Sequence, residues 1–373
     1  MAITSSVSRV APAELFSRRP TDDERARARE ILGSSTVIDT CGAIRPTGPG
    51  GSLDDSIAEL RANGINGVGL TLAAEEDGLQ AAMNMILKWN GLIRSYSNDL
   101  VHVRSADEIR QAREDGRIAV YYLLQNGRPF EDDPGNVELF RQMGVTSSQI
   151  TYNKKNFLGD GCLEPRDGGL SLLGREVIAE MNRVGMLVDL SHASRLTQQD
   201  AVLASTRPVY FSHCNVNAIC SIPRNAADDT LELVADRGGM AGVYPLDLTH
   251  DGEATVANVG EHLEHLLRVM GPDRVSFASD FPKGRPIIYE LAHLDDDGYL
   301  HIQHDGTHKV RRMKWDKPGC VPFYPWYKYA EGVGSYGEFV NVACELLVRG
   351  VPDDVVAGVL GENFLTFYEA NVG

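Results

Sequence analysis

Eight short apolar runs, separated by amphipathic stretches, constrain the fold of this chain more than any other feature. Most of them are apolar at every position rather than at alternate positions, which is typical of parallel strands that are buried on both faces. We therefore expect strands at 36–39, 66–72, 118–124, 148–153, 186–192, 208–213, 239–245 and 274–280.

Apolar residues at helical spacing fill most of the intervals between these runs. The expected helices lie at 53–63, 79–95, 106–114, 136–143, 172–184, 257–270 and 337–349. Such alternation of strand and helix predicts an α/β fold, with a (β/α)8 TIM-type barrel as first choice and a doubly wound open sheet as second. Residues 1–34 are interpreted as an arm and a charged helix capped by Thr21, so the barrel is expected to occupy 35–373.

The segment 282–330 breaks this rhythm, because it has no clear helical pattern. An irregular insertion of this length is usually a lid or an interface, and after the eighth strand it is expected over the carboxyl end of the barrel. Its histidines do not repeat at a strict spacing, which favours a solvated hairpin over a second metal site. They are His293, His301, His304 and His308.

The charge balance limits the partners of the chain. Lys plus Arg number 36 and Asp plus Glu number 52, so the formal net charge is −16. This argues against binding to nucleic acid or to an anionic membrane surface. No apolar run is long enough to span a bilayer, no secretory signal is recognised at the N-terminus, and the cysteines form no CxxC pair. We therefore expect a cytoplasmic protein with reduced thiols.

Polar residues end several of the expected strands, and barrel active sites lie at that end. His192 and His213 each follow a serine, and Asp280 follows another. A lone histidine there is more often a hydrogen-bonded cap, but two imidazoles and one carboxylate converging on one face suffice to hold one divalent metal. Further candidates at the strand ends are Asp39, Cys41, Gln125, Tyr152, Asn153 and Tyr244.

Arg224 follows the sixth expected strand closely. Its planar guanidinium suits two-point binding of a substrate carboxylate. A structural salt bridge with Asp228 or Asp229 is an equally good interpretation from the sequence.

The run GLSLLGREVIAEMNRVGMLVDLSHAS (169–194) resembles the membrane dipeptidase family, which is renal dipeptidase-like and forms peptidase family M19. Further signatures of that family are similar, in the same order, to PVYFSHCNVNAICSIPRNAADD (208–229), SDF (279–281) and GENFL (361–365). The resemblance implies a barrel, zinc-dependent dipeptidase activity with two bridged zinc ions, and compatibility with a homodimer.

Residue by residue, the resemblance covers half of the family's site. His192 and His213 match its two-histidine zinc half, Arg224 matches the arginine that binds the substrate carboxylate, and Asp280 matches the aspartate that handles the proton of water.

The other half of the site departs from the family pattern. Cys41 and Ala43 stand where the family has His and Asp, Gln125 stands where it has the bridging Glu, and Tyr152 replaces a substrate-contacting His. Two Zn²⁺ ions bring four positive charges, and Asp280 is the one family carboxylate left to balance them. We therefore predict that the binuclear zinc centre is absent.

Two states of the site stay open. In one, a single divalent metal (zinc or iron) sits on His192, His213 and Asp280, with Cys41 as an added soft ligand. In the other, no metal binds and His192, His213, Tyr152 and Asp280 act as acid–base groups.

The leading hypothesis is an enzyme for a small, amino-acid-derived substrate whose carboxylate Arg224 holds, in a pocket that also uses Gln125, Asn153, Cys41 and Tyr244. The reaction is either amide hydrolysis with one metal or metal-free isomerase- or lyase-type chemistry, and specialised biosynthesis is a reasonable setting. The alternatives are a non-catalytic pseudoenzyme with a filled pocket and an ordinary zinc dipeptidase.

Overall fold

The computed structural model describes residues 14–44, 52–73, 75, 77–250, 252–281, 293–294, 299–302, 311–314 and 329–372. Its main sheet has nine strands that pair in parallel, and eight of them follow one another in chain order. These eight are β1 (Val37–Gly42), β2 (Ile65–Thr71), β4 (Ile118–Leu124), β5 (Val145–Gln149), β6 (Leu187–Asp189), β7 (Tyr210–Cys214), β8 (Met240–Val243) and β9 (Val275–Phe277). The ninth, β3 (Leu100–His102), pairs with the first half of β4, whose second half pairs with β5.

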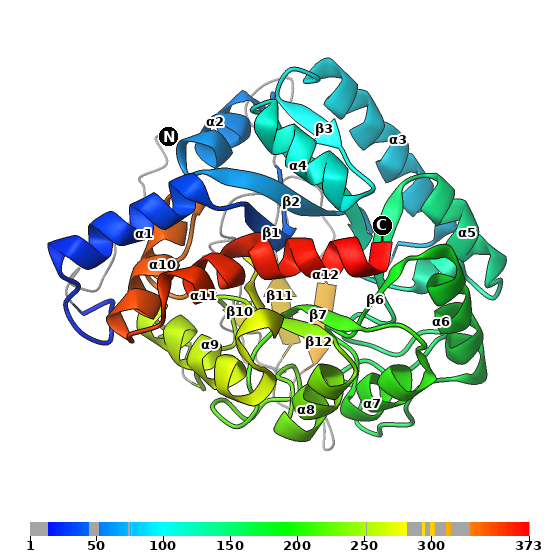
Figure 1. Cartoon of the computed structure of the whole chain (residues 1–373). Helices are drawn as coiled ribbons and strands as arrows, with labels where there is room; N and C mark the ends of the chain where they lie inside the picture. Colours follow the sequence, from blue (N-terminus) through cyan, green and yellow to red (C-terminus); the bar gives the residue numbers. More distant parts are fainter. Residues whose placement is uncertain are drawn as a thin grey trace.

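Helices surround this sheet (Figure 1). They are α1 (Asp22–Ser34), α2 (Asp54–Ala62), α3 (Leu79–Ser95), α4 (Ala106–Glu114), α5 (Gly135–Gln142), α6 (Leu172–Val184), α7 (Arg195–Ala204), α8 (Asp228–Asp236), α9 (Val256–Met270), α10 (Phe339–Val348), α11 (Asp353–Ala357) and α12 (Asn363–Val372). The (β/α)8 barrel predicted from the sequence is confirmed, and the open sheet is wrong. None of the described helices has the length and apolar character needed to cross a bilayer.

The predicted cap of the first helix is confirmed in detail. The Thr21 hydroxyl accepts a hydrogen bond from the Glu24 amide, and the Glu24 carboxylate accepts one from the Thr21 amide. This capping box satisfies two amide groups that the first turn would otherwise leave unpaired. Residues 1–13 of the predicted arm lie outside the described residues, and the domain boundary at 34/35 stays a prediction.

The first and eighth barrel strands meet through specific contacts at both of their ends. At the carboxyl end, the Asp280 amide donates to the Cys41 carbonyl over 2.8 Å. At the amino end, a π-helical turn, Gly358–Glu362, lies between the strands, and the Glu362 carboxylate accepts from the Thr36 amide over 2.6 Å. A Cβ atom on Gly361 would lie 2.2 Å from the Thr36 carbonyl oxygen, so only glycine fits at this contact.

The insertion after the eighth barrel strand contributes a small antiparallel sheet of three strands. They are β10 (His293–Leu294), β11 (Tyr299–Ile302) and β12 (Arg311–Lys314). Figure 1 draws this sheet fainter, and so more distant, than the front helices and within the outline of the barrel. Of the four histidines, His293 and His301 pair through their backbones, whereas His304 and His308 lie outside the described residues.

Phe281, which precedes the insertion, and Tyr329, near its end, lie at the carboxyl end of the barrel. The Tyr329 hydroxyl donates to the Asp280 carbonyl oxygen over 2.5 Å, and the Phe281 and Tyr329 rings lie 5.3 Å apart between centroids. The insertion therefore starts and finishes beside the strand ends, as predicted for a lid or an interface; which of the two it forms stays a prediction.

Sequence patterns misplaced one strand and missed others. The fourth barrel strand is β5, at 145–149 rather than 148–153, so Tyr152 and Asn153 lie in the loop after it. Helices α7, α8, α11 and α12 and strand β3 were not predicted. Of these, α7 and α8 begin soon after site residues. Their apolar residues at helical spacing are few and follow polar segments, so the helical pattern was not recognised.

Candidate functional site

The residues predicted for the site gather at one end of the barrel. Cys41 and His213 lie within β1 and β7. The others follow the ends of five further strands, and these are Gln125, Tyr152, Asn153, His192, Tyr244 and Asp280. Residues more than 230 positions apart in the chain thus become neighbours because parallel barrel strands end at the same rim.

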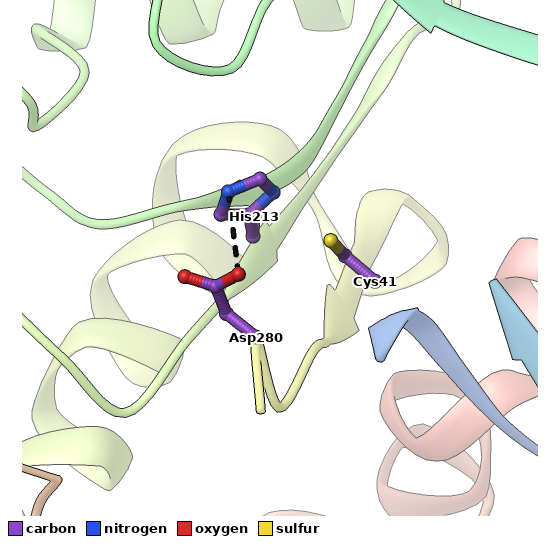
Figure 2. Close-up of side chains that lie close together, drawn as sticks. All are labelled: Cys41, His213 and Asp280. Carbon is purple, nitrogen blue, oxygen red and sulfur yellow. Dashed lines mark ion pairs between the residues drawn. The ribbon is translucent and has the colours of Figure 1, made fainter. Parts of the chain in front are cut away.

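Three potential metal ligands come close together at the centre of this rim. One ligand atom each from Cys41, His213 and Asp280 lies within 4.8 Å of the others, and Figure 2 shows their side chains converging. The His213 Nε2 atom is 3.9 Å from an Asp280 oxygen. The Gln125 amide donates to the Cys41 sulfur over 3.1 Å and to Asp280 over 3.4 Å, so it ties the cluster together without adding charge.

A chain of hydrogen bonds fixes where the proton of His213 sits. The Ser212 hydroxyl donates to the Asp189 carboxylate over 2.5 Å, which uses its single proton. The Ser212 oxygen therefore accepts from the Nδ1 of His213, 2.8 Å away. The Nδ1–H tautomer leaves a lone pair on Nε2.

His192 is held in the same tautomer. Its Nδ1 lies 2.8 Å from the Oδ1 of Asn153, which also accepts from the Cys162 thiol. Nδ1 consequently carries the proton, and Nε2 again carries a lone pair. The two Nε2 atoms lie 2.9 Å apart. Two lone pairs that face each other at this distance fit an electropositive atom between them, the arrangement of metal-ligating histidines oriented by their outer neighbours.

Burial sets the ionisation of the site. Desolvation, with the nearby Arg224 guanidinium as the next cause, holds the pKa values of His192 and His213 well below the ordinary value. Both imidazoles are therefore neutral, as metal ligands must be. Burial raises the pKa of Asp280 to about 7, against the opposing charge of Arg224.

Arg224 is buried beside the histidines rather than paired with the acidic residues that follow it. Its guanidinium lies 4.9 Å from the centre of the Tyr244 ring and donates to the His213 carbonyl over 3.0 Å. Asp228 contacts His265 and Asp229 contacts Arg195. The salt-bridge interpretation is therefore wrong, and the binding of a substrate carboxylate by Arg224 stays a prediction.

A small cavity of about 10 Å³, room for about one water molecule, lies among these residues. Its lining comprises Tyr152, Asn153, His192, Arg224, Tyr244, Asp247 and Asp280. Six of these were predicted from the sequence. Gln125, His213 and Cys41 are not among these lining residues, and the expected role of Gln125 and Cys41 in substrate contact stays a prediction.

Strained backbone marks the same place. His192, Asp247 and Asp280 have φ angles of 66°, 57° and 47°, in the left-handed region that non-glycine residues rarely adopt. Such residues cluster at functional sites, where the surrounding structure holds them. Asp247 was not predicted: its carboxylate accepts from the Tyr244 hydroxyl over 2.6 Å, and its sequence context, PLDLTH, contains no recognisable motif.

Asp39, a candidate at the end of the first strand, does not face the cavity. Its fully buried carboxylate accepts from the Ser279 amide and hydroxyl and from the Tyr336 hydroxyl. These bonds commit it to joining the first and last strands of the barrel. The partner Tyr336 was not identified from the sequence because it lies 297 residues away.

The chain is similar to known proteins in sequence and in fold. The profile of the family described as membrane dipeptidase (peptidase family M19) matches residues 26–296. Dipeptidase verJ of Clonostachys rogersoniana is 28% identical over 78% of this chain and 65% of its own length, and dipeptidase aclJ of Aspergillus oryzae is 29% identical over 67% and 51%. The chain thus spans about half to two thirds of the curated relatives it matches.

Solved structures show the same fold. An amidohydrolase from Pseudomonas aeruginosa superposes with a TM-score of 0.78 at 34% identity, covering 93% of this chain and 99% of that one. A metallopeptidase described as dipeptidase AC superposes with a TM-score of 0.68 at 20% identity, covering 85% and 89%, and supports the fold alone. The barrel, the paired histidines and the family match together show that the chain belongs to the membrane dipeptidase family, an enzyme family of hydrolases.

Proposed function

We propose that this protein hydrolyses a small amide with a free carboxylate, such as a dipeptide or a related amino-acid derivative, and that it uses a single divalent metal ion. The ion would be held by His192, His213 and Asp280, with Cys41 as an additional soft ligand. Dipeptidases and an amidohydrolase among the relatives support the reaction class.

The observation that carries the proposal is the pair of imidazole Nε2 atoms 2.9 Å apart. Each ring donates its Nδ1 proton to an oxygen, so neither has a proton to place between the two nitrogens. The donor set also suits the group: two neutral imidazoles, one carboxylate and one thiol satisfy zinc or ferrous iron. A divalent ion bound there would supply Lewis-acid activation of a carbonyl and of water.

The chain's own residues then divide the remaining tasks. Arg224 binds the substrate carboxylate with the guanidinium donors that point away from His213. Tyr152 stacks on His192 with 4.0 Å between ring centroids and forms a flat wall beside the amide. Asp280 takes a proton from the attacking water and returns it to the leaving amine.

A second metal ion is not part of the proposal, because the cluster lacks the charge to balance it. Gln125 is neutral, and the Asp39 carboxylate is already committed to Ser279 and Tyr336. Four positive charges beside one carboxylate, Asp280, would be strongly uncompensated in a buried site.

Elemental analysis of the purified protein tests the proposal most directly. We expect one zinc or iron per chain, lost with turnover in His213→Ala but retained in His265→Ala, a histidine variant on the outer helix α9. Two metal ions per chain would refute the charge argument. Turnover without metal would select acid–base chemistry by Tyr152 and Asp280, and neither metal nor turnover across a dipeptide panel would indicate a pseudoenzyme.

A further inference from the structure

Asp247 lines the small cavity of the candidate site, but the proposed function gives it no task. Its φ angle of 57° lies in the left-handed region, which persists at a non-glycine residue only where the surrounding structure holds it. Two asparagine side chains hold it here. The Asn225 amide donates to the Asp247 carbonyl over 3.0 Å, and the Asn215 amide donates to the preceding carbonyl, that of Leu246. The backbone thus fixes the position from which the Asp247 carboxylate reaches the cavity.

Tyr244 contacts both Asp247 and Arg224, each at a different part of its side chain. The Arg224 guanidinium lies over the ring, 4.9 Å from its centre, whereas the Tyr244 hydroxyl donates to the Asp247 carboxylate over 2.6 Å. Arg224 and Asp247 line the same cavity, yet in the part of the chain that the structure describes they form no ion pair with each other. The Tyr244 hydroxyl therefore holds a carboxylate near a guanidinium without the two being paired.

An ion pair between Arg224 and Asp247 would be favourable if this hydrogen bond were lost. Arg224 is 3% exposed and Asp247 is half-buried, so both charges are largely removed from water. A buried charge without a partner is costly, and contacts between a guanidinium and a carboxylate are among the strongest hydrogen-bonded pairs. The protein's own carboxylate therefore competes with a substrate carboxylate for Arg224 unless another group restrains it.

We infer that Tyr244 is a positioning residue that keeps the Asp247 carboxylate away from Arg224, and so leaves the guanidinium to the carboxylate of the substrate. The inference rests on the proposed function, which places the substrate carboxylate at Arg224. The ring of Tyr244 supports the guanidinium, and its hydroxyl restrains the competing acid. Ligands whose terminal carboxylate is blocked as an amide gain nothing from this arrangement, so it selects substrates with a free carboxylate.

Binding of two uncleavable ligands tests the inference apart from turnover. The reduced-amide analogue of Ala-Ala has a methylene in place of the scissile carbonyl, and its carboxamide form lacks the charge of the terminal carboxylate. By calorimetry on the purified protein, we expect the carboxylate form to bind about tenfold more tightly than the carboxamide form. Tyr244→Phe keeps the ring and removes the hydroxyl. It should reduce this preference to about twofold or less, because the released Asp247 pairs with Arg224.

A double variant distinguishes restraint of Asp247 from a structural role of the Tyr244 hydroxyl. Tyr244→Phe combined with Asp247→Asn removes the competing charge and should restore a preference of about fivefold or more. A preference lost through a disturbed fold, or through a missing contact between the hydroxyl and the ligand, would not return. Tyr210→Phe is the matched control, because it removes a buried tyrosine hydroxyl that bonds to Ser147 at the start of β7. It should keep the full preference.

The inference would be overturned by equal binding of the two forms to the unaltered protein, by a preference that survives Tyr244→Phe, by a loss that the double variant does not reverse, or by an equal loss in Tyr210→Phe. Hydrolysis assays separate it from the function on which it rests. The expected pattern of binding, with no hydrolysis of any dipeptide, refutes the proposed reaction and leaves the role of Tyr244 supported. Dipeptide hydrolysis without that pattern refutes the role of Tyr244 and leaves the reaction supported.

Discussion

Two buried aspartates on opposite sides of the barrel, Asp39 and Asp189, accept the same kinds of hydrogen bond but serve different purposes. Asp39, at the first strand, accepts from the Cys41 amide two residues ahead and from both the amide and the hydroxyl of Ser279. The residue after Ser279 is the site residue Asp280. The fourth donor is the Tyr336 hydroxyl, 2.8 Å away.

Asp189, at the fifth strand, repeats this pattern. It accepts from the amide of Ser191, again two residues ahead, and from both the amide and the hydroxyl of Ser212. The residue after Ser212 is the site residue His213. The fourth donor is the Ser191 hydroxyl, 2.7 Å away.

The two clusters differ in what the serine oxygen accepts. The Ser279 hydroxyl oxygen accepts a hydrogen bond from the backbone amide of Phe281, whereas the Ser212 hydroxyl oxygen accepts one from the imidazole Nδ1 of His213. The last hydrogen bond of the Asp39 cluster (Asp39, Ser279 and Tyr336) is therefore with a backbone amide, and the cluster joins the first and last strands of the barrel. The last hydrogen bond of the Asp189 cluster (Asp189, Ser191 and Ser212) is with the His213 side chain, and it sets the tautomer of that imidazole. The same local arrangement of hydrogen bonds thus stabilises the fold around Asp39 and orients the candidate metal ligand His213 beside Asp189.

The largest expected effect is on stability, and it tests whether the Asp39 cluster holds the barrel closed. Asp39→Asn replaces one acceptor oxygen by a donor that faces either the Cys41 and Ser279 amides or the Ser279 and Tyr336 hydroxyls, in a fully buried place. We expect the free energy of unfolding to fall by about 3 kcal/mol in urea denaturation. Asp107→Asn, whose side chain is 91% exposed, should change it by less than about 0.5 kcal/mol. A loss equal to that of this control would show that the Asp39 cluster does not hold the barrel closed.

A smaller effect, on metal affinity, tests whether the Asp189 cluster sets the tautomer of His213. Ser212→Ala removes the acceptor of the His213 Nδ1 proton, and loss of such an outer partner typically weakens metal affinity by about 10- to 100-fold. Ser191→Ala is the control, because Ser191 donates to the same carboxylate and contacts His213 through its backbone amide rather than its imidazole. Chelator competition gives the affinities, and the ¹⁵N shifts of His213 give the tautomer. If both variants weaken binding equally, or the shifts do not change, the contact with Ser212 does not select the tautomer.

Much of the fold could be predicted because its strands and helices depend on the pattern of apolar residues within short segments. Buried parallel strands are apolar throughout, and helices such as 79–95, 106–114 and 172–184 begin and end at the predicted residues. The shift of β5 has a local cause too: its sequence, VTSSQ, is polar although all five residues are buried. Its apolar neighbour Ile150 drew the prediction toward the loop.

The site could be predicted as a list of residues but not as a network. Strand ends and the family resemblance indicated His192, His213 and Asp280. No spacing rule pairs Asp189 with Ser212 or Asp39 with Tyr336, since those contacts join positions that only the closed barrel brings together. Asp247 was missed for a different reason: its partner Tyr244 is close in sequence, but its left-handed backbone angle is not apparent from the sequence.

The smallest effect extends the comparison to pH. His262 on α9 accepts from the Val216 amide over 3.0 Å and donates to the Leu248 carbonyl over 3.0 Å. It thereby supports the loop behind His213 and has no counterpart among the residues that contact Asp39. Burial, the largest cause, lowers the pKa of His262 to about 4 from 6.5, and a protonated ring could no longer accept from Val216.

Below pH 6.5 an unfolded His262 binds a proton that the folded protein excludes, so the stabilisation is complete above that pH and declines as pH falls toward 4. Between pH 7.5 and 5.5 we expect a loss of about 1 kcal/mol from this group. His262→Gln preserves a donor and an acceptor without titrating, and should flatten this part of the pH dependence; His265→Gln controls for the packing of α9. Hydrogen exchange should show the Val216 amide losing protection on acidification while the Asp280 amide, bonded to Cys41, keeps it. Equal loss at both amides would mean that acid loosens the whole barrel rather than its histidine side.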